Sequence, residues 1–208
     1  MARYTGPACR QCRREGDKLY LKGERCHTSK CAIEERNYPP GERTYGRRRW
    51  SEYGRQLREK QKMKRTYGLL ERQFSNIFEK AEHSRGITGE VLLRLLEMRL
   101  DNTIFRLGFA GSRRQARQLI DHGHIKVNGK KVDISSYTVD VGDVIEIVDS
   151  MKENTEVKKY TSLAEQSGLP GWLNMTSGMK GKVLREPEPA DVTDVQFEDY
   201  LVVELYSK

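Results

Sequence analysis

Four cysteines fall within the first 31 residues of this chain, and no other cysteine follows. They form two close pairs, Cys9 with Cys12 and Cys26 with Cys31, separated by a loop of thirteen residues. Two thiolate pairs that meet across a short loop have the spacing of a tetrahedral four-sulfur metal site. A segment of about forty residues with so few apolar side chains needs such a staple, so we expect a metal to fold it.

Zinc is the metal that this spacing favours, because close cysteine pairs on either side of a loop are typical of structural zinc sites. An iron–sulfur cluster also takes four cysteines, and spacing alone does not exclude it. The surrounding Arg and Lys residues are expected to lower the thiol pKa values and so to support the thiolate form. Four protein ligands leave no open position for a water molecule, so we assign the metal no catalytic role. The alternatives are four unligated thiols or a redox pair at Cys9 and Cys12.

Charge is the dominant feature of the composition. The formal net charge is +8 and the isoelectric point is about 9.3, which favours a polyanionic partner. Of the 208 residues, 36% are hydrophobic and 33% are charged, so we expect one or two small cores. No run of eighteen apolar residues is present, and the segment before Cys12 lacks an apolar export signal. We therefore expect a cytoplasmic protein with no membrane partner and reduced cysteines.

Apolar residues recur at helical spacing through the middle of the chain and predict three helices. The first covers about 51–67 and mixes Arg and Lys with aromatic residues, and the second covers about 70–81. The third begins after Thr88 and is expected to break near 100–102. The end of the chain, at 200–206, is expected to form a strand.

The stretch 109–132 is the most informative local pattern. Ser112 and Gln115 predict a capping box that starts a helix at the next residue, and Gly123 ends it. Alternating apolar residues then predict a strand, and the Asn-Gly pair at 128–129 predicts a two-residue hairpin turn. We expect one side of the helix to pack and the other to be cationic, with these residues pointing largely away from the core: Arg113, Arg114, Arg117 and Gln118.

A short Arg-bearing helix beside a basic hairpin can hold a nucleic-acid backbone across a groove. Base edges of A-form RNA are hard to reach, so shape would select the partner, and RNA is favoured over DNA. The plain alternative is an exposed amphipathic helix with solvated arginines.

These patterns together predict an α+β protein. We expect a metal-stapled segment at 1–45 and a mostly helical domain at 46–98, joined by the C-terminal tail 196–208. The second domain, 99–195, is expected to hold a helix-helix-β-hairpin RNA-binding module and a small antiparallel sheet with a strand at about 182–185.

The stretch 109–130 resembles an RNA-binding module found in small-subunit ribosomal protein four, in some pseudouridine synthases, in bacterial tyrosyl-tRNA synthetases and in a heat-shock RNA-binding factor. Further segments extend the resemblance to bacterial small-subunit ribosomal protein four over nearly the whole length, and especially to members that carry zinc-binding cysteines. These segments are Met1–Pro7, Tyr20–Cys26, Pro39–Gly41, Leu57–Lys62 and Arg99–Asn102. Residues 151–199 match less distinctly, and no role is transferred to them.

This resemblance implies a structural protein that binds the five-prime domain of 16S ribosomal RNA at a multi-helix junction early in 30S assembly. It also implies small-subunit proteins three and five as neighbours, and a place beside the channel through which messenger RNA enters, with an influence on translational accuracy. The implied metal ligands are Cys9, Cys12, Cys26 and Cys31. The implied RNA-binding residues are Arg47, Arg48, Arg49, Arg55, Arg58, Lys60, Lys62, Arg113, Arg114, Arg117, Gln118, His122, His124, Lys126, Asn128 and Lys130.

Two other classes of protein compete with this interpretation. An RNA-modifying enzyme or ribosome-associated factor could carry the same module, but the sequence has no Gly-rich phosphate loop, Gly-x-Ser-x-Gly or His-Glu-x-x-His motif. We therefore expect no enzyme and no small-molecule substrate. A zinc-dependent DNA-binding regulator would need a recognition helix near the cysteine pairs, and the loop between them is interrupted by glycines and charges.

Overall fold

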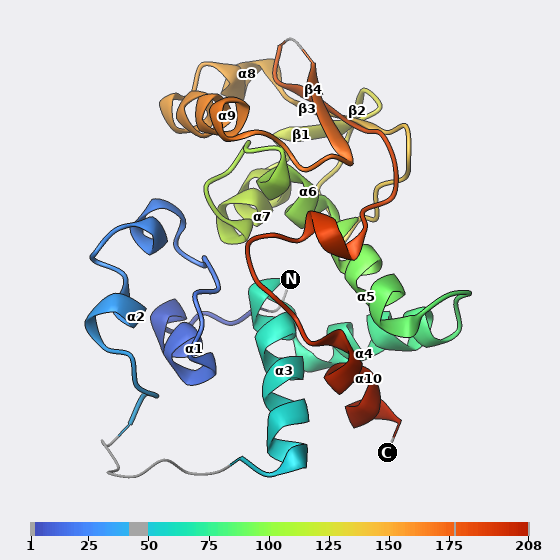
Figure 1. Cartoon of the computed structure of the whole chain (residues 1–208). Coiled ribbons are helices and arrows are strands. Elements are labelled where there is room, and N and C mark those ends of the chain that lie inside the picture. The colour runs from blue at the N-terminus through green and yellow to red at the C-terminus, as the bar shows by residue number, and fades with distance from the viewer. Residues whose placement is uncertain (1–2, 42–49, 177, 208) are drawn as a thin grey trace. The chain divides into compact units, whose positions relative to one another are not determined.

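The computed structural model describes residues 3–41, 50–176 and 178–207. The chain divides into two compact units: Met1–Leu93 together with Val192–Lys208, and Arg94–Asp191 (Figure 1). The three domains expected from the sequence, with boundaries near 45, 98 and 195, stay a prediction.

The N-terminal part of the first unit is a set of short helices around a small core. It contains α1 (Ala8–Glu15), the 3-10 helix η1 (Gly23–His27) and α2 (Ala32–Glu35). Buried in this core are Ala8, Cys12, Leu19, Leu21 and Val195. So small a cluster contributes little hydrophobic free energy.

The rest of the first unit is helical. It contains α3 (Glu52–Thr66), α4 (Glu71–Glu82) and the start of α5 (Thr88–Glu97), so the three helices predicted from periodicity are confirmed. The Ser51 hydroxyl caps α3 by accepting a 3.1 Å hydrogen bond from the Gly54 N–H.

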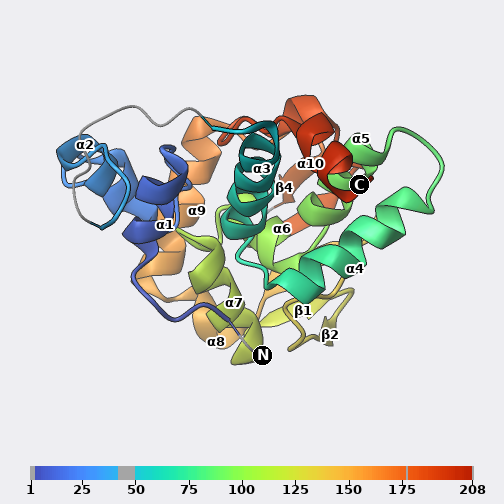
Figure 2. The ribbon, with the colours of Figure 1, turned by 90° about the horizontal axis from the view of Figure 1, so that it is seen from below.

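The C-terminal segment is the helix α10 (Asp199–Tyr206), so the strand expected at 200–206 is wrong. Figures 1 and 2 both show α10 beside α3, and the two helices are in extensive contact. Leu201 and Val202 are buried, and the Gln56 amide donates to Glu204 at 2.9 Å. A short run of apolar residues suits a strand or a buried helix equally well, and here packing against α3 decides the outcome.

The second unit combines helices with one antiparallel sheet. After the last turn of α5, its elements are α6 (Leu100–Arg106), α7 (Arg113–Asp121), β1 (Ile125–Val127), β2 (Lys130–Lys131), β3 (Val144–Ile147), α8 (Asp149–Lys152), α9 (Thr155–Ser167), β4 (Leu173–Thr176), β5 (Lys180–Val183) and the 3-10 helix η2 (Pro189–Asp191). The sheet order is β2-β1-β3-β5-β4, and every neighbouring pair is antiparallel. The expected α+β class is therefore confirmed.

One continuous core holds this unit together. Figure 1 shows α6 and α7 on one side of the sheet, and their apolar side chains pack with those of β1, β3 and β5. The predicted hairpin turn is confirmed, because Asn128 and Gly129 have φ values of 50° and 77° and Val127 pairs with Lys130.

Two details of the second unit differ from expectation. The helical stripe breaks at Met98 and Arg99 rather than at 100–102, where the chain forms a bridge between Arg99 and Thr138. The expected strand at 182–185 begins earlier, as β5, and it pairs with β4, which the sequence did not indicate. Across the described ranges, no helix is both long and apolar enough to cross a membrane.

Candidate RNA interface and cysteine cluster

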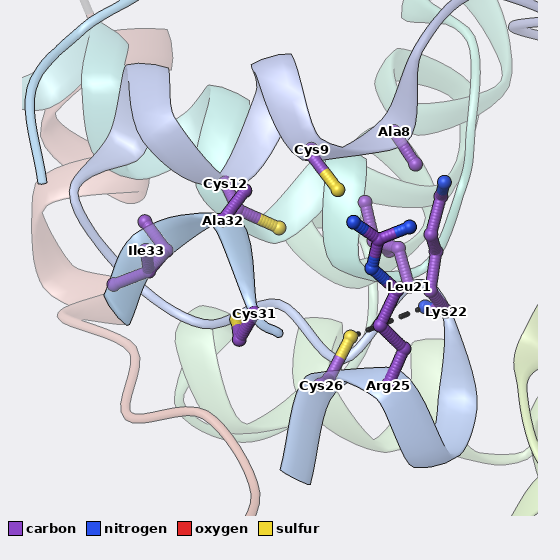
Figure 3. Close-up of a pocket in the computed structure, with 10 residues that line it drawn as sticks. All are labelled: Ala8, Cys9, Cys12, Leu21, Lys22, Arg25, Cys26, Cys31, Ala32 and Ile33. Atoms are coloured by element: carbon purple, nitrogen blue, oxygen red, sulfur yellow. Dashed lines mark hydrogen bonds between the residues drawn. The ribbon is translucent and has the colours of Figure 1, made fainter. Parts of the chain in front are cut away.

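The four cysteines come from three elements and line one pocket. Cys9 and Cys12 lie on α1, Cys26 lies in η1, and Cys31 directly precedes α2. Figure 3 shows the sulfur atoms of Cys9, Cys12 and Cys26 directed into the space that they share. None of the four is in a disulfide, and all but Cys9 are buried. The fold therefore brings two separate pairs of cysteines together as four free thiols.

Burial controls the acidity of two of these thiols. The pKa of Cys12 is raised to about 11, mainly by burial and to a smaller extent by the other three sulfurs, while a hydrogen bond from the Leu19 backbone lowers it. Burial also raises the pKa of Cys26, although the Lys22 N–H donates to its Sγ at 3.4 Å. The expectation that nearby Arg and Lys lower the thiol pKa values is therefore wrong for Cys12 and Cys26, because burial is the largest cause at both and raises the pKa.

The donor set fits a four-sulfur metal site in its chemistry and its grouping. Soft sulfur donors in a pocket with an apolar lining suit zinc, and the Lys22 N–H is the kind of donor that steadies a metal-bound thiolate. As placed, however, no three His, Cys, Asp or Glu side chains of the described residues stand close enough to form a metal-binding group. The structure therefore supports clustering of the cysteines but does not show metal stapling.

The predicted RNA-binding residues of α7 and the hairpin differ in exposure. The exposed ones are Arg114, Gln118, His122, Asn128 and Lys130. Arg117, His124 and Lys126 are half-buried, and Arg113 is buried. Lys131, which was not among the predicted RNA-binding residues, is also exposed beside Lys130. An outward row of polar and cationic groups thus runs from the helix to the hairpin.

Arg113 is only 6% exposed, so the expectation that it points away from the core is wrong. Its Nε donates to Asn102 Oδ1 at 2.8 Å, and its guanidinium lies 4.6 Å from the centre of the Phe105 ring. Arg113 precedes Ala116 by three residues and Ile120 by seven, which places it on the apolar stripe of the helix. That spacing was the available sign that it faces inward.

Two further residues have their side chains occupied within the protein. Arg117 donates through Nε to Asp101 Oδ2 at 2.7 Å. The Asn128 amide donates to Asp143 Oδ1 at 2.8 Å, and its Oδ1 accepts from the Val144 N–H at 2.9 Å. The Asn128 side chain therefore ties the hairpin turn to β3.

The basic residues of α3 are paired with carboxylates within the first unit. Arg58 lies 3.5 Å from Glu15, and Lys62 lies 2.8 Å from Asp17. Lys60 contacts Glu71, and Arg55 lies 3.9 Å from Glu52. The carboxylate partners of Arg55, Lys60 and Lys62 are exposed, so each of these pairs contributes about 0–1 kcal/mol and RNA phosphates could compete for these three cations.

Arg65, which was not among the predicted RNA-binding residues, contacts Glu15 together with Arg58. The Glu15 side chain is 1% exposed, and burial raises its pKa against the opposing effect of the two arginines. The other predicted contacts, Arg47, Arg48 and Arg49, lie outside the described residues.

Comparison with known families matches two consecutive segments. Residues 3–97 match the family described as "Ribosomal protein S4/S9 N-terminal domain", and residues 98–145 match the "S4 domain". The second match contains α6, α7 and the hairpin.

Full-length relatives are also found among curated proteins. The chain is 58% identical to "Small ribosomal subunit protein uS4" of Thermodesulfovibrio yellowstonii, over 100% of both chains. It is 56% identical to "Small ribosomal subunit protein uS4A" of Clostridium botulinum and 54% identical to the uS4 protein of Desulforamulus reducens, again over 100% of each chain.

Proposed function

The chain belongs to the small ribosomal subunit protein uS4 family, and from that premise we propose that it is a structural component of the cytoplasmic small subunit that binds 16S ribosomal RNA directly. The family consists of structural ribosomal proteins, so the chain is not an enzyme. The match to the ribosomal relatives covers 100% of both chains. An RNA-modifying enzyme that shared only the RNA-binding module would match over that module alone.

The outward row on α7 and the hairpin is the observation that carries RNA binding. Arg114, Gln118 and Lys130 are exposed on α7 and on the hairpin, and α7 and β1 pack on one core, so the backbone positions of these residues keep a fixed spacing. Such a surface suits the regular phosphate spacing of folded RNA, where several contacts together select a shape. Phosphate contacts of this kind supply salt-sensitive affinity.

Filter binding in moderate salt tests this proposal. The full chain should prefer a fragment of the five-prime domain of 16S RNA over duplex DNA of equal length. Replacing Arg114 and Lys130 by alanine should weaken binding to the fragment and lower the slope of log affinity against log salt by about two. Lys158→Ala on α9, which also removes an exposed cation from the second unit, is the matched control and should change the slope by less. A preference for DNA would refute the proposal.

We also propose a finer placement within the subunit, on the strength of the family resemblance. The chain would bind a multi-helix junction of the five-prime domain early in 30S assembly. It would lie next to small-subunit proteins three and five, beside the channel through which messenger RNA enters, and so influence accuracy. Reconstitution of the subunit without the chain should leave protection of that junction incomplete, and crosslinking should recover both neighbours and messenger RNA.

We further propose that Cys9, Cys12, Cys26 and Cys31 hold one zinc ion. Their grouping around one pocket as free thiols supports this. Bound zinc would supply on the order of 10 kcal/mol of apparent folding free energy to a segment whose own core is small. Because the ligands must lose their protons, binding should weaken as the pH falls.

Elemental analysis of the purified chain tests the metal. One zinc per chain is expected, iron would favour the cluster alternative, and neither metal would refute the site. Cys26→Ser should release the metal and disorder the N-terminal segment while the second unit stays folded. His27→Ala is the matched control: this neighbouring side chain stacks on Tyr20 with ring centres 5.0 Å apart, so its loss should leave the metal bound.

A further inference from the structure

Two polar residues in the first turn of α6 are buried almost completely. Asp101 is 2% exposed and Asn102 is 0% exposed. Burying a carboxylate or an amide costs several kcal/mol unless hydrogen bonds replace the lost water. Their partners therefore show what this position of the fold requires.

Asp101 joins its own segment to α7. Arg99 donates to both of its oxygens, from Nε at 3.2 Å and from Nη2 at 3.0 Å. Arg117 of α7 donates to Oδ2 through Nε at 2.7 Å. One buried carboxylate thus binds two arginines, Arg99 just before α6 and Arg117 on α7.

Asn102 forms a second link to the same helix. Its Nδ2 donates to the Glu97 backbone oxygen and to Glu97 Oε2, both at 2.8 Å, and its Oδ1 accepts from Arg113 Nε at 2.8 Å. Glu97 is itself fixed by two 2.8 Å bonds from Arg106. The amide therefore connects Arg113 to a carboxylate that is already held.

These two links fix the rotation of α7 about its own axis. Arg113 and Arg117 are four residues apart, so they lie one above the other on one face, while Arg114 and Gln118 form the next row, about 100° around the helix. Apolar packing is not directional, whereas hydrogen bonds to charged groups are. Anchors one turn apart therefore hold the outward row at a set angle.

We propose that Asp101 is a positioning residue of the RNA interface: through Arg117, and beside the link from Asn102 to Arg113, it orients α7 so that Arg114 and Gln118 meet the RNA backbone. This inference rests on the proposed RNA-binding function. Asp101 itself is buried, so its proposed role is through Arg117 and not through a contact of its own with RNA.

The sign of one substitution separates positioning from simple electrostatics. Asp101→Asn keeps the shape of the side chain and removes a negative charge close to the RNA-binding helix. Electrostatics alone predicts tighter binding to a polyanion and a steeper salt dependence. Loss of positioning predicts the opposite, a fall in affinity of about tenfold or more, because misplaced donors no longer meet their phosphates together.

The experiment compares full-length variants for binding to the five-prime domain fragment across a salt series, with thermal unfolding followed in parallel. Asp149→Asn is the matched control, because it makes the same change at an exposed carboxylate of the second unit, next to Lys152. A folded Asp101→Asn protein that binds about tenfold more weakly, beside an Asp149→Asn protein that binds as well as the unchanged chain or better, supports the proposal. Equal or tighter binding by Asp101→Asn overturns it.

Arg117→Lys decides the matter if Asp101→Asn does not fold. Lysine keeps the charge but lacks the Nε donor that meets Asp101, so affinity should fall while the salt slope stays the same. Binding equal to that of the unchanged chain overturns the proposal. Failure of the unchanged chain to prefer ribosomal RNA would instead refute the proposed function, so the two failures are distinguishable.

Discussion

Arg113→Ala is expected to destabilise the second unit rather than to remove a contact with RNA. The substitution deletes the 2.8 Å bond to Asn102 and the stacking of the guanidinium on the Phe105 ring at 4.6 Å. A hydrogen bond to a charged group contributes about 1.5–3 kcal/mol, and a desolvated cation–π contact contributes about 2 kcal/mol. Together with the buried amide oxygen left unpaired, the free energy of unfolding should fall by about 3–5 kcal/mol.

Urea unfolding followed by tryptophan fluorescence measures this loss. The chain has two tryptophans, and Trp172 is fully buried in the second unit, so a Trp50→Phe background leaves a probe that reports on that unit alone. Arg114→Ala is the matched control, because it removes the neighbouring and exposed arginine and should change stability by about 0.5 kcal/mol or less. Equal stability of the two variants would refute an inward, structural role for Arg113.

Three further outcomes follow from the packing and charge of named residues. Gly181→Ala should destabilise the second unit by about 1–3 kcal/mol in urea unfolding, because its Cβ would lie 2.4 Å from both methyl carbons of the buried Leu107. Gly171→Ala, whose Cβ would meet nothing closer than 3.4 Å, should be nearly neutral in the same assay. Burial raises the pKa of Tyr206 from 10.0 to about 12, so the folded chain holds this proton more tightly than the unfolded chain does. Its contribution to stability should therefore be constant below about pH 10 and be lost between about pH 10 and 12, and Tyr206→Phe should abolish that loss in a pH series of unfolding curves. Arg114→Ala should lower the salt slope of RNA binding by about one in filter binding.

Local chemistry made α7 and its hairpin predictable. Ser112 caps the helix by accepting from the Gln115 N–H at 3.3 Å, and an Asn-Gly pair permits the positive φ values that the turn needs. In a full capping box the Gln115 side chain would accept a hydrogen bond from the Ser112 N–H. It instead accepts from the Gly111 N–H at 2.9 Å and donates to Glu156. The Ser112 cap depends only on neighbours in the chain and was predictable. The Gln115 side chain also binds Glu156, which is 41 positions away and could not be anticipated.

Elements that depend on distant partners were not predictable in the same way. The strand β4 has no strong pattern of its own and is defined by its pairing with β5, and α10 takes its form from contact with α3. The links from Asp101 to Arg117 and from Asn102 to Arg113 were also not predicted, because they join residues 16 and 11 positions apart. Sequence spacing shows which residues share a face, but not which face another element covers.

The same limit applies to the cysteine cluster. Spacing correctly brought the two pairs together, since all four cysteines line one pocket. It gave the wrong direction for the thiol pKa values of Cys12 and Cys26, because it counts neighbouring charges and contains no measure of desolvation.

The basic helix α3 shows why a count of cations overstates a binding surface. Arg58 and Lys62 face Glu15 and Asp17, and both carboxylates come from the segment that holds the cysteines. A phosphate that binds these cations competes with a carboxylate, which lowers the net gain in affinity. The net charge of +8 is therefore an incomplete guide to where RNA binds, and the outward row of α7 and the hairpin is the stronger candidate because it is exposed on a rigid frame.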